Sequence, residues 1–192
     1  MKVETKNSIQ LKICAITGLV FLALNQIMLL QGNTFIQNQT PIDYAHWLLL
    51  IGVVMTLSLN HIFSDNNFRT TASILTSLGV IALVGQATID FLWWSYGTDY
   101  ERMNDLTNQI VGRPSIRIPF ITIGPALFYL GLALHAGKYI KQRTLWSLIV
   151  ISAVVITGLG SFAFDSRNMI VLGHFALTIG ITGLVLKKKK IR

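Results

Sequence analysis

Charged residues are scarce in this chain. Of its 192 residues only 12% are Asp, Glu, Lys or Arg, whereas 52% are hydrophobic. A water-soluble domain usually carries about 25% charged residues, because its surface must face water. The shortage excludes an ordinary soluble domain and points to a chain whose surface faces lipid.

Cysteine and the common catalytic motifs are also missing. Cys14 is the only cysteine, which excludes an intramolecular disulfide and a metal site built from cysteines. The chain contains no HExxH motif, no GxSxG motif and no glycine-rich phosphate loop. The usual signatures of zinc proteases, serine hydrolases and P-loop nucleotidases are therefore absent.

Long apolar runs dominate what is present. Each of six runs is long enough to cross about 30 Å of hydrocarbon as a helix. The sequence predicts an all-α membrane protein, a six-transmembrane-helix bundle that forms a single integral membrane domain over residues 1–192. The predicted spans are 11–31, 44–62, 72–96, 118–137, 145–164 and 169–186.

The basic residues predict the orientation of the bundle. Twelve of the 16 Lys and Arg residues fall at the two termini and in the second and fourth gaps. Because Lys and Arg in short loops favour the cytoplasmic side, both termini are expected inside. We expect a multi-pass protein of the cell membrane, with gaps one, three and five outside.

The net charge of +8 is explained by the same distribution. Five of the basic residues lie in the C-terminal sequence KKKKIR. Anionic lipid headgroups are the expected partner of this tail. Nucleic acid is not an expected partner.

The gap between spans three and four carries helix signals of its own. Thr98 stands three residues before Glu101, the spacing of a capping box. Apolar residues then recur at helical intervals until Gly112 and Pro114 end the pattern. We expect a short amphipathic helix over 99–111 on the outer surface, either as an interfacial loop or as a lid.

Asp90 interrupts the third apolar run. A carboxylate at the centre of a span costs about 3 kcal/mol, less near the interface, so Asp90 is expected to face protein or water. Gly79, Gln86 and Trp93 share its helix face by their three- and four-residue spacing. Arg117 enters span four from the same side and is the expected ion-pair partner of Asp90.

Residues at similar depth in other spans predict a polar pocket that faces outward. Asp165 and Arg167 are expected at its rim. An ion pair between Asp90 and Arg117 that only fixes helix register is the alternative. The predicted lining residues are Asn25, His46, Gln86, Asp90, Trp93, Arg117 and His174.

The four histidines form two pairs by depth. His46 and His61 lie about four turns apart on span two, while His174 matches the depth of His46 and His135 matches that of His61. This layout resembles that of di-haem b-type cytochromes, in which histidines are axial ligands. Such spacing is a weak signal, so no cofactor is expected and haem is kept as an alternative. The other alternative is a metal site formed by His46, His174 and Asp90.

Two weaker patterns concern symmetry and packing. Residues 53–67 and 154–168 match at five of fifteen positions, including Thr56 with Thr157, which suggests two inverted halves of three spans, as in many secondary transporters. In span six, small residues recur at positions 173, 176, 180 and 183. Such a stripe predicts close helix packing within the bundle, with a homo-oligomer interface as the alternative.

Four functions remain open on the sequence alone. The first is a small carrier or ligand-binding protein with an outward-facing polar pocket, in which no catalysis is expected. The others are a structural subunit of a membrane complex, a di-haem electron carrier and a metal-dependent enzyme that modifies lipids.

Overall fold

The computed structural model describes residues 2–63 and 67–186, and every regular element within these ranges is helical. Six stretches are long and apolar enough to cross a membrane, which confirms the six predicted transmembrane helices. Their ends differ from the predicted ends by no more than four residues. They are Ser8–Leu30, Tyr44–Ile62, Thr70–Ser95, Pro114–Gly137, Thr144–Phe162 and Arg167–Leu186.

Four spans are single helices and two are composite. The single helices are α1 (Lys2–Leu30), α5 (Asn67–Ser95), α9 (Thr144–Phe162) and α10 (Arg167–Leu186). The second span is made of α3 (Tyr44–Met55), η1 (Thr56–Ser58) and α4 (Leu59–Ile62). The fourth is made of α7 (Pro114–Ile116), η2 (Arg117–Ile123) and α8 (Gly124–Gly137).

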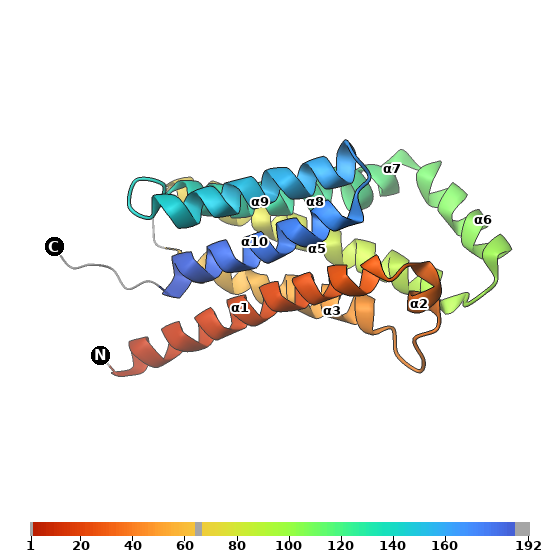
Figure 1. The fold of residues 1–192 in the computed structure, drawn as a ribbon, viewed down its shortest axis with the longest axis horizontal. Helices are drawn as coiled ribbons and strands as arrows, with labels where there is room; N and C mark the ends of the chain where they lie inside the picture. The colour runs from red at the N-terminus through yellow and green to blue at the C-terminus, as the bar shows by residue number, and fades with distance from the viewer. Residues whose placement is uncertain (1, 64–66, 187–192) are drawn as a thin grey trace.

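The six spans form a closed ring of three hairpins. The closest neighbours are consecutive spans: α1 with α3, α5 with α8, and α9 with α10. Contacts of α3 with α5, α8 with α9, and α1 with α10 join the hairpins and close the ring. The start of α1 and the end of α10 lie at one end of the bundle, and α6 (Tyr100–Val111) lies at the other (Figure 1).

Glycines allow the two helices of each hairpin to approach closely. A side chain at Gly18 would meet the carbonyl oxygen of Gly52 at 2.7 Å, so α1 and α3 touch through their backbones. Gly79 of α5 lies directly against the backbone of Phe128 in α8, and Gly180 of α10 lies against Val150 of α9. Small residues at a crossing are a common way to pack helices in lipid.

The small-residue stripe of span six is used inside the chain. Gly173 packs on Thr157, and Gly183 packs on the ring of Trp146, both residues of α9. These contacts account for the stripe at these positions by packing within the bundle.

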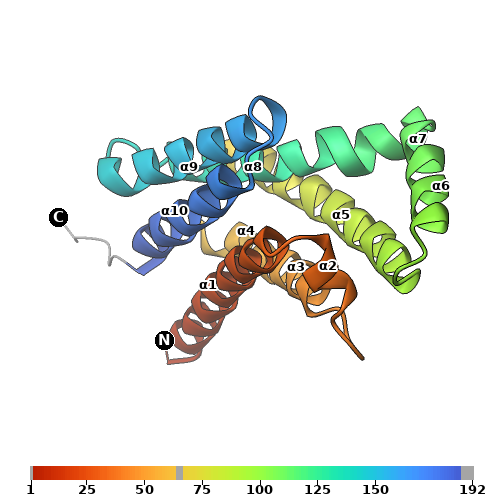
Figure 2. The same cartoon turned by 45° about the vertical axis from the view of Figure 1, so that its right-hand side comes forward.

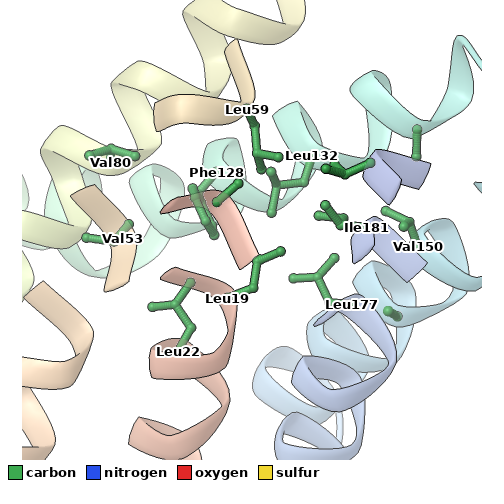
Figure 3. Packing of buried hydrophobic residues seen from close by; sticks show 14 of the residues in the cluster. Leu19, Leu22, Val53, Leu59, Val80, Phe128, Leu132, Val150, Leu177 and Ile181 are labelled. Atoms are coloured by element: carbon green, nitrogen blue, oxygen red, sulfur yellow. The ribbon is translucent and has the colours of Figure 1, made fainter. Parts of the chain in front are cut away.

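The apolar core fills the half of the bundle nearest the chain ends. Figure 3 shows Leu19, Phe128, Leu132 and Ile181 converging from three hairpins. Phe128 is fully buried, and Leu19, Leu132 and Ile181 are each 1% exposed. This core holds the hairpins together and forms a floor for the other half.

Two short helices, α2 (Asn33–Gln37) and α6, lie at the other end of the bundle. The helix α2 follows α1 and is attached to α5, because the indole Nε1 of Trp94 donates to the carbonyl of Ile36 at 3.1 Å. Helix α6 lies beyond the divergent ends of α5 and the fourth span (Figure 2). Its predicted existence is confirmed, but its cap is Asp99 rather than the Thr98–Glu101 box. The Asp99 carboxylate accepts from the backbone N–H of Arg102 at 3.2 Å, which leaves Thr98 outside the helix.

The fourth span widens where prolines interrupt it. Residues of η2 form a π-helix, which takes more residues per turn than an α-helix. Pro119 lies within it, and Pro125 is the second residue of α8, which follows it. Since proline has no N–H to donate, the regular α-helical ladder cannot run through these positions. The span is therefore continuous, but its hydrogen-bonding pattern changes at η2.

Two sequence predictions lie partly or wholly outside the described residues. The basic tail falls within 187–192, and the first half of the inverted-repeat comparison includes 64–66. The pairing of spans as three hairpins neither requires nor shows two inverted halves.

Candidate functional site

A large cavity lies in the half of the bundle nearest α6. Its volume is about 820 Å³, within the range of small-molecule sites in proteins. All six spans, α2 and α6 contribute to its walls. Leu22, Leu83 and Phe128 line it from the side of the core.

The structure brings most of the sequence-predicted site residues to this cavity. Six of the seven line it: Asn25, His46, Gln86, Asp90, Trp93 and His174. The shared face of the third span is also found, since Gly79 faces α8 while Gln86, Asp90 and Trp93 continue it into the cavity.

Arg117 does not line the cavity, and the predicted Asp90–Arg117 ion pair is wrong. Arg117 opens the π-helical segment and is exposed. Among the described residues the basic partner of Asp90 is His46, whose Nε2 lies 3.8 Å from Asp90 Oδ2. Depth along the span did not predict which arginine reaches the cavity. The arginine of the cavity is Arg167, the first residue of α10.

His46 is held between two carboxylates. Its Nδ1 lies 2.5 Å from Oδ2 of Asp43, and its own backbone N–H donates to Oδ1 of Asp43 at 3.1 Å. Asp43 is therefore the N-cap of α3 and also fixes the imidazole ring. Because Nδ1 is bound to Asp43, Nε2 is the nitrogen presented toward Asp90, at a distance too long for a direct hydrogen bond.

A chain of amides runs from Arg167 to the backbone of α3. The Nη1 group of Arg167 donates to Oε1 of Gln26 at 3.2 Å, and Nε2 of Gln26 donates to Oδ1 of Asn25 at 2.8 Å. Asn25 in turn donates from Nδ2 to the carbonyl of Ala45 at 2.9 Å. The chain joins α10, α1 and α3 across the ring and fixes the orientation of both amides.

A third polar group joins α8 to α10. The hydroxyl of Tyr129 lies 2.9 Å from Nε2 of His174, and Nδ1 of His174 lies 2.8 Å from the carbonyl of Ile170. A carbonyl only accepts, which assigns the proton to Nδ1 and makes Nε2 the acceptor for Tyr129. Both nitrogens of His174 are thus used by the protein.

These contacts bear on the metal and haem alternatives. Within the described part of the chain, no group of three or more His, Cys, Asp and Glu side chains is arranged to hold a metal ion. Asp43 and Asp90 lie at opposite nitrogens of one imidazole, so they do not converge on one point. The second proposed histidine pair is unequal: His61 is exposed, whereas His135 is buried, stacks on Phe63 with 5.0 Å between ring centres and bonds to Asn60.

Three polar residues that line the cavity or hold a lining residue were not among the residues predicted from the sequence: Asp43, Gln26 and Tyr129. Asp43 had a visible signal, because it precedes a helix and stands three residues before His46, the geometry of an N-cap contact. Gln26 and Tyr129 gave no comparable signal. Gln26 adjoins a predicted residue, and the partner of Tyr129 is 45 residues away.

The arrangement suits binding more than a defined reaction. It offers a fixed imidazole nitrogen, a carboxylate and a guanidinium in one partly apolar enclosure, together with the Tyr129 hydroxyl that donates to His174. Comparisons with protein-family models, with curated proteins and with solved structures found no match for this chain.

Proposed function

We propose that this chain is a multi-pass membrane protein that binds a small molecule in the cavity, as a carrier or a ligand-binding protein. The observation that carries the proposal is the cavity of about 820 Å³ lined by all six spans. A bundle that served only as a scaffold would be expected to fill this space with side chains, because protein interiors are closely packed.

Polar groups with unused bonding capacity support the proposal. Among the described residues no group donates a hydrogen bond to Asp90, although it lines the cavity and its side chain is only 30% exposed. Arg167 has a single described hydrogen bond, to a neutral amide. A partly buried carboxylate without a direct hydrogen bond is costly unless water or a ligand solvates it.

The charge distribution orients the cavity. With both termini in the cytoplasm, as the basic residues favour, the α6 end is outside and the cavity opens toward the outer side of the membrane. Helix α6 then lies at the outer interface, with Thr107, Ile110 and Val111 lining the cavity.

Thiol labelling tests whether the cavity is open to water from outside. In a Cys14→Ala background, Gln86→Cys places a thiol in the cavity, and Ile81→Cys places one on the 63% exposed outer face of the same helix. We expect a charged, membrane-impermeant thiol reagent to modify position 86 in intact cells and to leave position 81 unmodified. Equal protection of both positions would favour a structural subunit with no accessible cavity.

A cavity-filling variant tests occupancy. A side chain at Gly158, which lines the cavity, would meet no atom within 4 Å, and the same is true at Gly137 outside it. We expect native mass spectrometry of protein purified in mild detergent to detect a bound small molecule. Gly158→Trp should abolish it and Gly137→Trp should retain it. A bound mass that survives in both variants would place the ligand elsewhere and contradict the proposal.

A further inference from the structure

The cavity has a polar wall and an apolar wall. The polar wall is formed by α1, α3, α5 and α10, and its side chains are Gln26, His46, Gln86, Asp90 and Arg167. The apolar wall is formed by α6, η2 and α9. Its large side chains are Ile110, Val111, Ile121 and Phe162, and its polar groups are hydroxyls without charge, those of Thr107, Thr122, Thr157 and Ser161. A ligand that fills this space meets charge on one side and hydrocarbon on the other.

The apolar wall is open toward the outside of the bundle. Val111 is 50% exposed, Ile121 39% and Phe162 66%, although all three line the cavity. Ile121 and Phe162 belong to candidate membrane spans, so their exposed surfaces face lipid acyl chains rather than water. Lipid therefore lies beside the apolar side chains that line the cavity.

Helix lengths explain the opening. The fourth span has 24 residues and α9 has 19. Counted residue by residue from the turn that joins the two spans, Phe162 corresponds to Pro119. Residues 114–118 of the fourth span therefore have no counterpart in α9. Figure 2 shows α5 and the fourth span diverging toward α6 on this side.

The polar wall carries two opposite charges that are not paired with each other. Asp90 is 3.8 Å from His46, and Arg167 bonds to Gln26. Arg167 also stands in the first turn of α10, where the helix dipole adds to its attraction for an anion. The wall thus offers one place for a cation, beside Asp90, and one for an anion, beside Arg167.

Building on the proposed function, we propose that the ligand is a membrane amphiphile with a zwitterionic head, an ammonium group joined to a phosphate. The ammonium lies against Asp90 and the phosphate against Arg167. The hydrocarbon tail follows Ile121 and Phe162 and leaves through the opening into the bilayer, so the cavity need not enclose the whole molecule.

Binding of three probes tests this assignment. The first is a lysophosphatidylethanolamine, the second a lysophosphatidylglycerol with the same tail, and the third is water-soluble phosphoethanolamine, which has the head alone. Native mass spectrometry of the full-length protein in detergent measures the bound fraction of each. We expect the lysophosphatidylethanolamine to bind about tenfold more tightly than the lysophosphatidylglycerol, since one charge-assisted contact is worth about 1.5–3 kcal/mol. It should also bind at least about tenfold more tightly than phosphoethanolamine, which has no hydrocarbon tail to bury.

Two cavity variants and their matched controls locate the head. Asp90→Asn should reduce the preference for lysophosphatidylethanolamine over lysophosphatidylglycerol to about twofold or less, because the ammonium loses its carboxylate. Arg167→Gln should weaken both phospholipids by about tenfold. The same changes at exposed positions outside the cavity, Asp99→Asn and Arg117→Gln, should leave all affinities unchanged.

Each opposite result overturns the assignment. Lysophosphatidylethanolamine binding that is equal in the wild type, Asp90→Asn and Arg167→Gln would identify a lipid held on the outer surface. Phosphoethanolamine that binds as tightly as the lysolipid would identify a water-soluble ligand and leave the proposed function standing. Failure of the proposed function is recognised separately, by protection of the thiol at position 86.

A filling variant keeps the test decisive if a charge variant does not fold. Gly158→Trp adds a large side chain at a cavity position where a Cβ meets no atom within 4 Å, and it changes neither charged residue. It should lower the affinity for lysophosphatidylethanolamine at least about tenfold, whereas Gly137→Trp should not. Unchanged affinity in Gly158→Trp would refute binding in the cavity.

Discussion

Asp43 makes two contacts that can be separated by mutation. Its side chain, 1% exposed, caps α3 through the backbone N–H of His46 and also bonds to the imidazole Nδ1 at 2.5 Å. The cap is worth about 1 kcal/mol. A buried hydrogen bond involving a charged group is worth about 1.5–3 kcal/mol. Asp43→Ala should therefore lower the free energy of unfolding by about 2.5–4 kcal/mol, the sum of the two contributions.

Asp99 provides the matched comparison. It caps α6 in the same way, through the N–H of Arg102 at 3.2 Å, but its only side-chain partner among the described residues is an exposed arginine. An exposed ion pair contributes little, so Asp99→Ala should cost about 1 kcal/mol. Asp43→Asn keeps an oxygen for the cap and loses the charge, so its cost isolates the contact with His46.

Reversible unfolding in mixed detergent micelles measures these differences. A cycle of Asp43→Asn, His46→Ala and the double variant should give a coupling energy of about 1.5–3 kcal/mol. Equal losses for Asp43→Ala and Asp99→Ala, together with a coupling energy near zero, would refute the conclusion that Asp43 holds the imidazole in place.

Three further variants test the packing, the second histidine and the orientation, the first two by unfolding in the same micelles. Gly158→Ala should stabilise the protein by up to about 1 kcal/mol because helix propensity rises with no clash, whereas Gly79→Ala should destabilise it by about 1–3 kcal/mol because α5 and α8 must separate; the reverse order would contradict the close approach. Tyr129→Phe should cost about 1–3 kcal/mol, since its histidine partner is left without a donor in a buried position, and a neutral effect would mean that water replaces the hydroxyl. In a Cys14→Ala background, Asn38→Cys should react with an impermeant thiol reagent in intact cells and Lys141→Cys only after lysis, and the opposite pattern would invert the topology.

Hydropathy was sufficient to predict the six spans, because lipid requires long apolar helices wherever the chain crosses. Helical spacing also predicted that Gln86 and Trp93 share the face of Asp90, and all three line the cavity. These predictions use one helix at a time, and information about one helix is present in its own sequence.

Contacts between helices could not be predicted from the residue pattern within any one helix. Depth put Arg117 and Arg167 at similar levels, but which of them enters the cavity depends on the direction each side chain takes around its helix axis. Arg117, the first residue of η2, does not line the cavity, whereas Arg167 does. The Tyr129–His174 contact depends on the order of spans around the ring, which hydropathy does not determine. Asp43 was the one omission that local spacing would have corrected.

The closed ring has a consequence for biosynthesis. Chains are made from the N-terminus, so α1 is inserted long before α10, the helix that completes the ring beside it. Until the last hairpin arrives, Gln26 lacks its arginine donor and the amide pair of α1 faces the gap that α9 and α10 later fill. A ribosome-bound chain that ends after α8 is thus an incomplete arc with polar groups turned toward lipid. Asn25 and Gln26, which are buried in the complete ring, are then without the helix that covers them.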